Sequence, residues 1–107
     1  MSNRVVRVKS WEEFKRLIMK HNPKSIAYNI EQAVPAKNLT GLRLILPIKG
    51  IRYVFIDNPI DGHLRKTSIP LHKDDLGNIY IKNEDVKSFV RSELKMKNLK
   101  LHSYWTI

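Results

Sequence analysis

The sequence contains no cysteine, which excludes a disulfide framework, thiolate nucleophiles and cysteine-ligated zinc. It contains only four glycines. It has no phosphate-cradling Walker loop, no dinucleotide-binding glycine triplet and no Gly-x-Ser-x-Gly elbow. No apolar run approaches the roughly 18 residues that a membrane-spanning helix needs. A cysteine-free basic chain fits a reducing cytosol, so we expect a cytoplasmic protein with no membrane partner.

Acidic residues are also few compared with basic residues. Ten aspartates and glutamates stand against twenty lysines and arginines, which gives a net charge of +10. Such an excess destabilises the compact state by self-repulsion unless an anionic partner compensates it. Nucleic acid is the commonest such partner. The alternatives are an anionic membrane surface or a basic surface that serves only solubility.

The 107 residues suit a single domain, 1–107, and 42% of them are hydrophobic, which is enough for one core. The basic residues concentrate at the two ends of the chain. Residues 1–24 carry seven basic and two acidic side chains, and residues 86–107 carry five and one, whereas residues 25–85 are nearly balanced. We expect the two terminal segments to pack side by side and to form one basic face.

Two helices are predicted from apolar spacing and capping signals. Ser10 begins a capping box, and the apolar residues behind it predict a helix over 11–21 that ends at Asn22-Pro23. Asn83 is the predicted N-cap of a second helix over 84–96, and Asn98 is its predicted left-handed stop.

The remaining segments predict strands and turns. Alternation and β-branched residues indicate strands, and clusters of Gly, Pro, Asn and Asp indicate turns. The expected strands are 4–9, 25–31, 42–46, 51–56, 67–71, 78–82 and 99–107, with a loop at 33–41 and turns at 47–50, 57–62 and 74–77. The fold class is α+β: one mixed or antiparallel sheet of about five to seven strands with two helices packed on one face, in the order β-α-β-β-β-β-β-α-β.

The second predicted helix carries the clearest binding pattern. Lys87, Arg91 and Lys95 recur every four residues and therefore form one row, which a phosphate backbone would stabilise. The alternative is a solvated helix face that happens to be basic. Lys97 and Lys100 extend this group towards the C-terminus.

The N-terminal cations form the other candidate group. Arg4, Lys20 and Lys24 are candidate phosphate ligands, and neither lysine has an acidic partner at helical spacing. In contrast, Arg16 has Glu12 and Glu13 at helical spacing, so we expect it to be held in salt bridges.

Aromatic residues give two further candidates. Tyr104 and Trp105 are adjacent on the last predicted strand, so one faces the core and the other could stack on a base, or lock the strand onto the core. The stretch 49–56 begins Lys-Gly and interleaves aromatics with valine, and so resembles the RNP1 signature of RRM domains. It has Ile51 where that family uses a stacking aromatic, and strand 4–9 has no aromatic to serve as RNP2. The residues therefore favour a hairpin strand whose Tyr53 and Phe55 belong to the core.

Catalytic patterns are weak. The four histidines have no zinc-ligand spacing, and Asp61 is the only acid near enough in sequence to orient His63. Both His63 and His72 are expected in exposed loops. The pair Glu93-x-Lys95 has the spacing of a metal-dependent nuclease, but on a predicted helix instead of a strand. We therefore expect neither an enzyme, nor a metal site, nor a cofactor.

The sequence thus predicts a non-enzymatic RNA-binding protein, such as a component of the ribosome or of another ribonucleoprotein. It would bind the phosphate backbone through lysines and arginines of its terminal strands and helices. A DNA-binding protein or transcription factor is the first alternative, and a small metal-dependent nuclease in which Asp57 or Asp61 holds the metal is the second.

Overall fold

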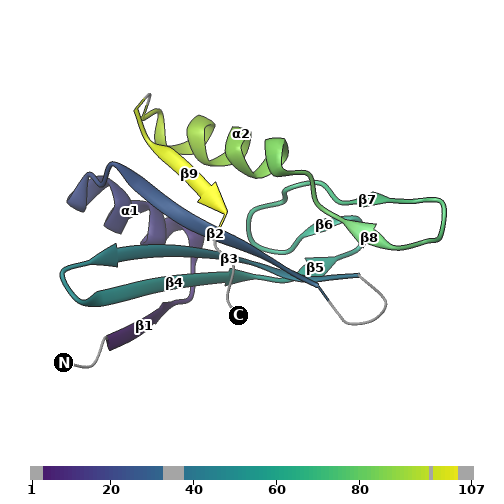
Figure 1. The fold of residues 1–107 in the computed structure, drawn as a ribbon, viewed down its shortest axis with the longest axis horizontal. Helices are drawn as coiled ribbons and strands as arrows, with labels where there is room; N and C mark the ends of the chain where they lie inside the picture. The colour runs from purple at the N-terminus through teal and green to yellow at the C-terminus, as the bar shows by residue number, and fades with distance from the viewer. Residues whose placement is uncertain (1–3, 33–37, 97, 104–107) are drawn as a thin grey trace.

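The computed structural model describes residues 4–32, 38–96 and 98–103. They form an α+β fold in which a mixed five-stranded sheet has the order β1-β4-β3-β2-β9 (Figure 1). The elements are β1 (Arg4–Val8), α1 (Trp11–His21), β2 (Ser25–Gln32), β3 (Leu39–Ile48), β4 (Ile51–Asp57), β5 (Pro59–Ile60), β6 (His63–Leu64), β7 (His72–Lys73), β8 (Ile79–Tyr80), α2 (Asn83–Leu94) and β9 (Lys100–Ser103).

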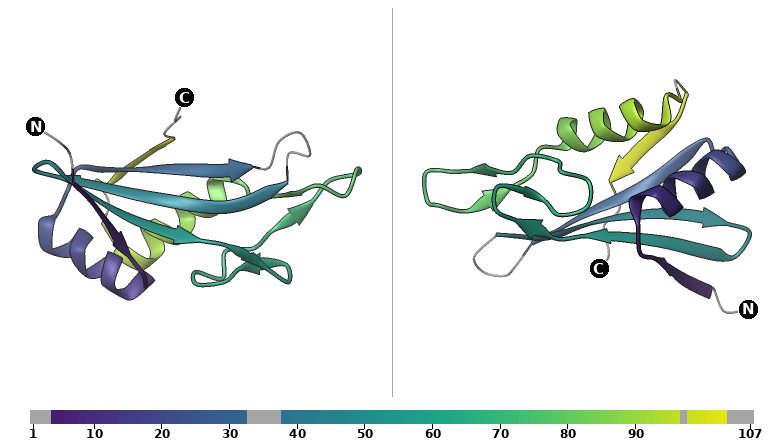
Figure 2. Two further views of the ribbon diagram at one scale, coloured as in Figure 1. Left: turned by 90° about the horizontal axis from the view of Figure 1, so that it is seen from below. Right: turned by 180° about the vertical axis from the view of Figure 1, so that it is seen from behind.

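Strand directions decide which chain segments meet. Strands β2, β3 and β4 form an antiparallel meander, while β1 is parallel to β4 and β9 is parallel to β2. Both helices cover the same face of the sheet, and no described helix covers the opposite face (Figure 2). The predicted fold class is confirmed, including the two helices on one face. No helix among the described residues is long and apolar enough to cross a membrane.

Helix α1 has the predicted bounds, because both of its ends are specified locally. The Ser10 side chain accepts a hydrogen bond from the Glu13 backbone N–H at 3.1 Å. At the other end Asn22 adopts a left-handed conformation with φ 46°, and its N–H donates to the Ile18 carbonyl at 2.8 Å. Asparagine tolerates this conformation better than most residues, which is why the helix stops there.

Helix α2 differs from its prediction at both ends. It begins at Asn83, with Lys82 as an N-cap that makes no side-chain hydrogen bond. The Asn83 side chain instead accepts a hydrogen bond from the Tyr28 hydroxyl at 2.7 Å. Burial raises the pKa of Tyr28, so the hydroxyl stays protonated as a donor. The helix ends at Lys95, with φ 54°, and not at Asn98.

The core lies between the helices and the sheet. Phe14 of α1 and Phe55 of β4 are fully buried, and both rings pack against the buried ring of Trp11. The Trp11 ring also packs at a tilt against Phe89 of α2, with ring centroids 5.0 Å apart. This aromatic cluster fixes the two helices against each other and against the sheet, because large rings contribute most of the buried apolar area.

The β3–β4 hairpin is confirmed, but its strands are longer than expected. Lys49 and Gly50 have φ values of 45° and 82°, which is the two-residue turn that matches the twist of a hairpin. Of the predicted loop 33–41, residues 33–37 lie outside the described residues, and 39–41 belong to β3. A Cβ at Gly41 would meet the Asp57 carbonyl oxygen at 3.1 Å, so this glycine allows a close approach of backbone to backbone.

The predicted strand pair 67–71 and 78–82 is wrong in its first member. Ser68 has φ 63°, and the segment turns around the buried Asp57 carboxylate instead of extending. The short strands β7 and β8 form one hairpin, closed by Asp74, which accepts hydrogen bonds from the Leu76 and Asn78 backbones. Those bonds hold the pKa of Asp74 below its usual value. The predicted last strand is confirmed over 100–103, and 104–107 lie outside the described residues.

Candidate nucleic-acid interface

One end of the molecule gathers exposed cations from many elements. At this end β1, β2 and β9 begin, the β3–β4 turn is made, and both helices end, on the left of Figure 1. We call it the basic end. Its cations are Arg4, Lys20, Lys24, Lys49, Arg52, Lys95 and Lys100.

Backbone hydrogen bonds hold these residues in place. The Lys100 N–H donates to the Lys24 carbonyl at 3.0 Å, which joins the start of β9 to the start of β2. On the other side of the sheet the Arg4 N–H donates to the Gly50 carbonyl at 3.0 Å, which joins β1 to the hairpin turn. The backbone positions of Arg4, Lys24 and Lys100 therefore follow from sheet pairing.

The cations of the basic end are uncompensated. All seven side chains are exposed, and none makes an ion pair among the described residues. Seven of the ten acidic residues lie at the opposite end of the molecule, at the ends of β2 and β4, in the β5–β8 hairpins and in the first turn of α2. They are Glu31, Asp57, Asp61, Asp74, Asp75, Glu84 and Asp85.

The helix dipoles oppose an anion here but are too weak to exclude one. Both helices point their C-termini at the basic end, and each terminus carries about −0.5 of an elementary charge. Together they amount to about one negative charge, against seven full positive charges. The positive potential of the side chains therefore dominates, and it extends over about 8–10 Å at physiological salt.

A hollow of about 580 Å³ opens in the middle of this end. Its walls are the segment 22–25 after α1 and the residues Met96, Asn98, Leu99 and Lys100 between α2 and β9. The side chains of Lys24 and Lys100 flank it, with exposed amides of Asn22 and Asn98 as further donors. Such a mixture of cations and neutral donors is what phosphate oxygens accept from.

The structure brings together only part of the predicted basic face. The terminal strands β1 and β9 do not pack side by side: they are the two opposite edges of the sheet. The prediction failed because β4, β3 and β2 lie between β1 and β9. The helices α1 and α2 do pack together, and Lys15 of α1 pairs with Glu93 of α2 at 3.6 Å.

Two members of the basic end were missed in the sequence. Lys49 and Arg52 come from the middle of the chain, where the net charge is nearly zero. The only available signal was the Lys-Gly pair in the predicted hairpin turn, since a turn tip is always at a sheet end. That this end would coincide with Arg4 depends on the parallel pairing of β1 with β4, which no local pattern indicates.

The row on α2 runs into the basic end. Phe89 and Glu93 face α1, so the periodicity of the helix places Lys87 and Arg91 on the flank away from α1. Lys95, the third residue of the row, is the left-handed C-cap at the basic end. Lys87 is half-buried and Arg91 is exposed.

The predicted salt bridges of Arg16 are absent. Arg16 is exposed and makes no ion pair with Glu12 or Glu13 in the part of the chain that the structure describes. An exposed ion pair of this kind gains little free energy, because the attraction is offset by the side-chain entropy lost on pairing. Arg16 is consequently as free as the cations of the α2 row.

The aromatic candidates divide into two groups. Phe55 is fully buried, and Tyr53 is half-buried on the same, helix-covered face, where its ring stacks on His21 at 6.3 Å. The RNP1-like stretch is therefore a core strand, as the residues favoured. Lys97, Tyr104 and Trp105 lie outside the residues whose side chains the structure describes.

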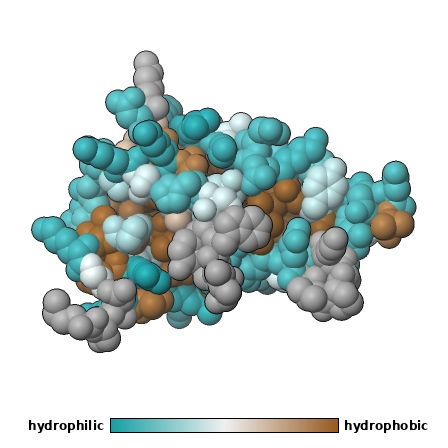
Figure 3. Space-filling model, in the orientation of Figure 1, coloured by the Kyte–Doolittle hydropathy of each residue, from teal (hydrophilic) through white to brown (hydrophobic). Residues whose placement is uncertain are grey.

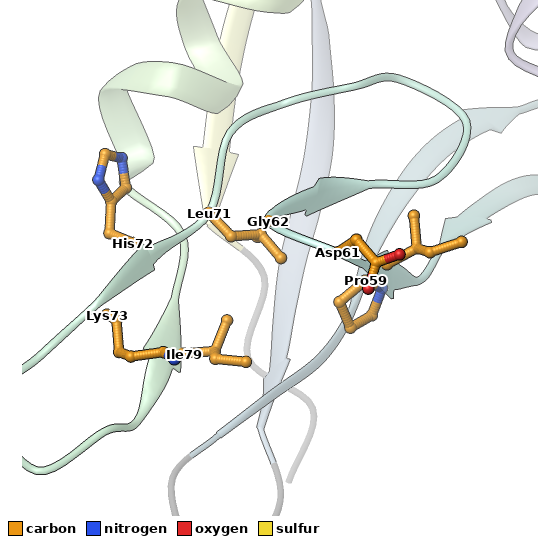
Figure 4. A pocket seen from close by; sticks show the side chains of 8 residues that line it. Pro59, Asp61, Gly62, Leu71, His72, Lys73 and Ile79 are labelled. Atoms are coloured by element: carbon orange, nitrogen blue, oxygen red, sulfur yellow. The ribbon is translucent and has the colours of Figure 1, made fainter.

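A second pocket lies at the opposite end of the molecule (Figure 4). It has a volume of about 470 Å³ between the β5–β6 turn and the β7–β8 hairpin. His72 is half-buried, not exposed as expected, and its Nε2 lies 3.0 Å from Asp85 Oδ2. In Figure 4 the imidazole points towards α2, while Asp61 lies on the other side of the pocket.

Two further candidate catalytic residues, Asp57 and His63, make contacts within the protein. Asp57 is fully buried, and its two oxygens accept three hydrogen bonds from Lys66 and Thr67. His63 Nδ1 lies 2.9 Å from the Leu64 carbonyl oxygen, and Asp61 does not orient it. Over residues 4–32, 38–96 and 98–103, no three metal-ligating side chains come together.

The comparisons with known proteins add no relative: no family model, no curated protein and no solved structure matches this chain.

Proposed function

We propose that this protein is a non-enzymatic nucleic-acid-binding protein, with RNA as the favoured ligand, and that the basic end binds the phosphate backbone. The observation that carries the proposal is the set of seven exposed, unpaired cations drawn from six separate segments to one end. Small, basic, cysteine-free α+β domains suit ribonucleoproteins, so a ribosome or another RNA–protein particle is the proposed setting.

Binding would be driven by release of counterions. Each phosphate that a lysine or arginine neutralises frees a condensed cation, so affinity falls with rising salt. The cations belong to a preformed backbone framework, so little of the chain has to be ordered on binding. Only the lysine and arginine side chains lose freedom.

The way the helices pack supports contact with the phosphate backbone of the nucleic acid over recognition of its bases. Each helix buries its apolar stripe against the sheet, Phe14 and Ile18 in α1, Val86 and Val90 in α2. Proteins that read DNA bases usually insert a helix or a two-stranded ribbon into the major groove. Both helices here present only a polar flank and a C-terminus, which favours RNA over a DNA-binding transcription factor.

A salt titration tests the proposal. If about four to six of the cations contact phosphate, the slope of log K against log salt should be roughly −3 to −5. Fluorescence anisotropy with a labelled structured RNA between about 50 and 300 mM KCl measures it, with a DNA duplex of the same sequence as the comparison. A slope near zero, or no binding at about 50 mM, would contradict the proposal.

We also expect no catalytic turnover. Incubation with RNA, DNA and simple phosphoesters in the presence of Mg²⁺, Mn²⁺ or Zn²⁺ should leave the substrates intact, because Asp57 is committed to three internal hydrogen bonds. The measurement is a gel assay of substrate cleavage at high protein concentration. Metal-dependent cleavage that disappears in a folded Asp61→Asn or Asp85→Asn variant would establish the nuclease alternative.

A further inference from the structure

The face of the sheet that the helices leave uncovered carries a second surface, which meets the basic end at Arg52. On β1, β4 and β3 the outward side chains alternate between aliphatic and cationic, and they enclose a hollow of about 310 Å³. Figure 3 views this face of the molecule, on which brown and teal side chains adjoin one another. We call this surface the open-face patch, and its residues are Val5, Arg7, Arg43, Ile45, Arg52, Val54 and Ile56.

Sheet register fixes the layout of the patch. Val54 lies at its centre, paired with Arg7 on one side and with Ile45 on the other. Arg43 is paired with Ile56, two residues further along β3 and β4 than the pair of Ile45 and Val54. Ile45, Val54 and Ile56 are thus contiguous, and Val5 is paired with Arg52 at the edge of the patch.

The aliphatic residues of the patch are only partly covered by the rest of the described chain. Val5 is 63% exposed, and Ile45, Val54 and Ile56 are half-buried with no helix above them. Arg43 pairs with Glu31, but its Nε has no hydrogen-bond partner within the described part of the chain. Arg7 and Arg52 make no ion pair there.

We propose that the open-face patch binds an acidic amphipathic segment of a partner protein, with apolar side chains on one side and carboxylates beside them. This proposal does not rest on nucleic-acid binding at the basic end, although Arg52 belongs to both surfaces. The apolar centre gives a phosphate backbone nothing to bind, whereas an aliphatic side chain of a peptide would be buried there. The arginines match carboxylates, which they bind in a bidentate fashion.

Size argues for a short segment instead of a second folded copy. Three strands about 4.8 Å apart, with about five residues each, give a patch roughly 10–14 Å wide and 17 Å long. This width suits one helix, which is about 10–12 Å across. The area of the patch falls far below the roughly 800 Å² that each partner buries in a stable dimer. A second copy would also bring its own arginines against these arginines.

The spacing of the cations specifies the peptide further. Arg7 and Arg43 are two strands and one register step apart, about 12 Å between their Cα atoms. Carboxylates two turns apart on a helix are separated by about 11 Å. An amphipathic helix with glutamates two turns apart on one flank could therefore reach both.

The experiment uses the full chain and a defined probe. The probe is a fluorescein-labelled helical peptide of about 16 residues, with leucines at i, i+3, i+4 and i+7 and glutamates on both flanks. In the control peptide, lysine replaces every glutamate. Anisotropy at about 100 mM salt should show binding of the glutamate peptide and none of the lysine peptide. Amide shifts in ¹⁵N spectra should concentrate on β1, β3 and β4.

Variants separate the patch from the basic end. Arg7→Gln should weaken peptide binding about three- to tenfold, and the double change Val54→Thr, Ile45→Thr about tenfold, since threonine keeps the β-branched shape but removes apolar surface. Lys24→Gln, which removes one charge at the basic end, should change peptide binding less than twofold. Circular dichroism confirms that each variant is folded.

Three results would overturn the proposal. The first is equal binding of the two peptides, or shifts located outside the three strands. The second is a dimer in sedimentation that the threonine double variant dissociates, which would make a second copy the occupant. The third is RNA affinity that Arg7→Gln lowers as much as Lys24→Gln does, which would make the patch part of the nucleic-acid interface.

Discussion

Replacing Asp57 by asparagine should destabilise the protein by about 2–4 kcal/mol. The carboxylate is completely buried at the end of β4 and accepts hydrogen bonds from the Lys66 and Thr67 backbone N–H groups and from the Thr67 hydroxyl, at 2.7 to 2.9 Å. An asparagine of the same shape keeps one oxygen and turns an NH₂ group towards donors. Each buried donor left without a partner costs about 1–3 kcal/mol.

Thermal and urea unfolding followed by circular dichroism measure this effect. For a domain of this size the midpoint should fall by roughly 10–20 °C, since each kcal/mol is worth about 4–8 °C. The matched control is Asp61→Asn, because Asp61 is exposed and sits in a turn with φ 26°, a conformation that asparagine tolerates. That control should stay within about 0.5 kcal/mol of the parent. Equal effects of the two changes would show that the Asp57 hydrogen bonds do not hold the 57–67 segment.

Neutralising three lysines of the basic end should weaken RNA binding about 100-fold at 0.1 M salt. The variant carries Lys20→Gln, Lys24→Gln and Lys100→Gln. All three side chains are exposed and unpaired, and glutamine suits the helix end, the loop and the edge strand that they occupy. If each contacts a phosphate, the salt slope falls in magnitude by about 2–2.7, which over one decade of salt corresponds to about 100-fold or more.

A matched variant separates position from total charge. Arg65, Lys73 and Lys82 are equally exposed but lie at the opposite end, and changing all three to glutamine lowers the net charge by the same three units. Its RNA affinity should fall only severalfold, through the long-range field that salt screens. Equal losses in both variants would mean that the net charge attracts RNA without a defined site.

Arg16 provides a smaller test inside α1. The sequence suggests that Glu12 and Glu13 hold it, which would make its replacement nearly neutral for binding. Because it is unpaired in the structure, Arg16→Gln should lower affinity about as much as Arg91→Gln, the single change at an exposed position of the α2 row. The two single variants are measured in the same titration.

The sequence by itself determined the local elements. The α1 helix could be placed to the residue because Ser10, Glu13 and Asn22 act through hydrogen bonds between neighbours in the chain. The β3–β4 hairpin was predictable for the same reason, through the residues of its turn. The two helices were expected on one face from the order of the predicted elements and the long apolar centre of the chain.

In two places a contact in the tertiary structure overrode the local preference of the sequence. Asn83 is a good N-cap by type, but Tyr28 from β2 takes its side chain. Residues 67–71 have strand-like composition, but the buried carboxylate of Asp57, ten residues earlier, turns them. Each of these outcomes depends on a partner distant in sequence, which local patterns do not report.

The candidate interface divides in the same way. Sequence charge identified Arg4, Lys20, Lys24, Lys95 and Lys100 as candidate nucleic-acid-binding residues, and the structure places all five at one end. It could not identify Lys49 and Arg52, because their segment is electrically neutral along the chain. Strand order brings them to the basic end: β1 pairs with β4 across a long sequence separation, so the hairpin turn lies beside the N-terminal strand. Charge is a property of the residues, but its concentration at one end is a property of the sheet.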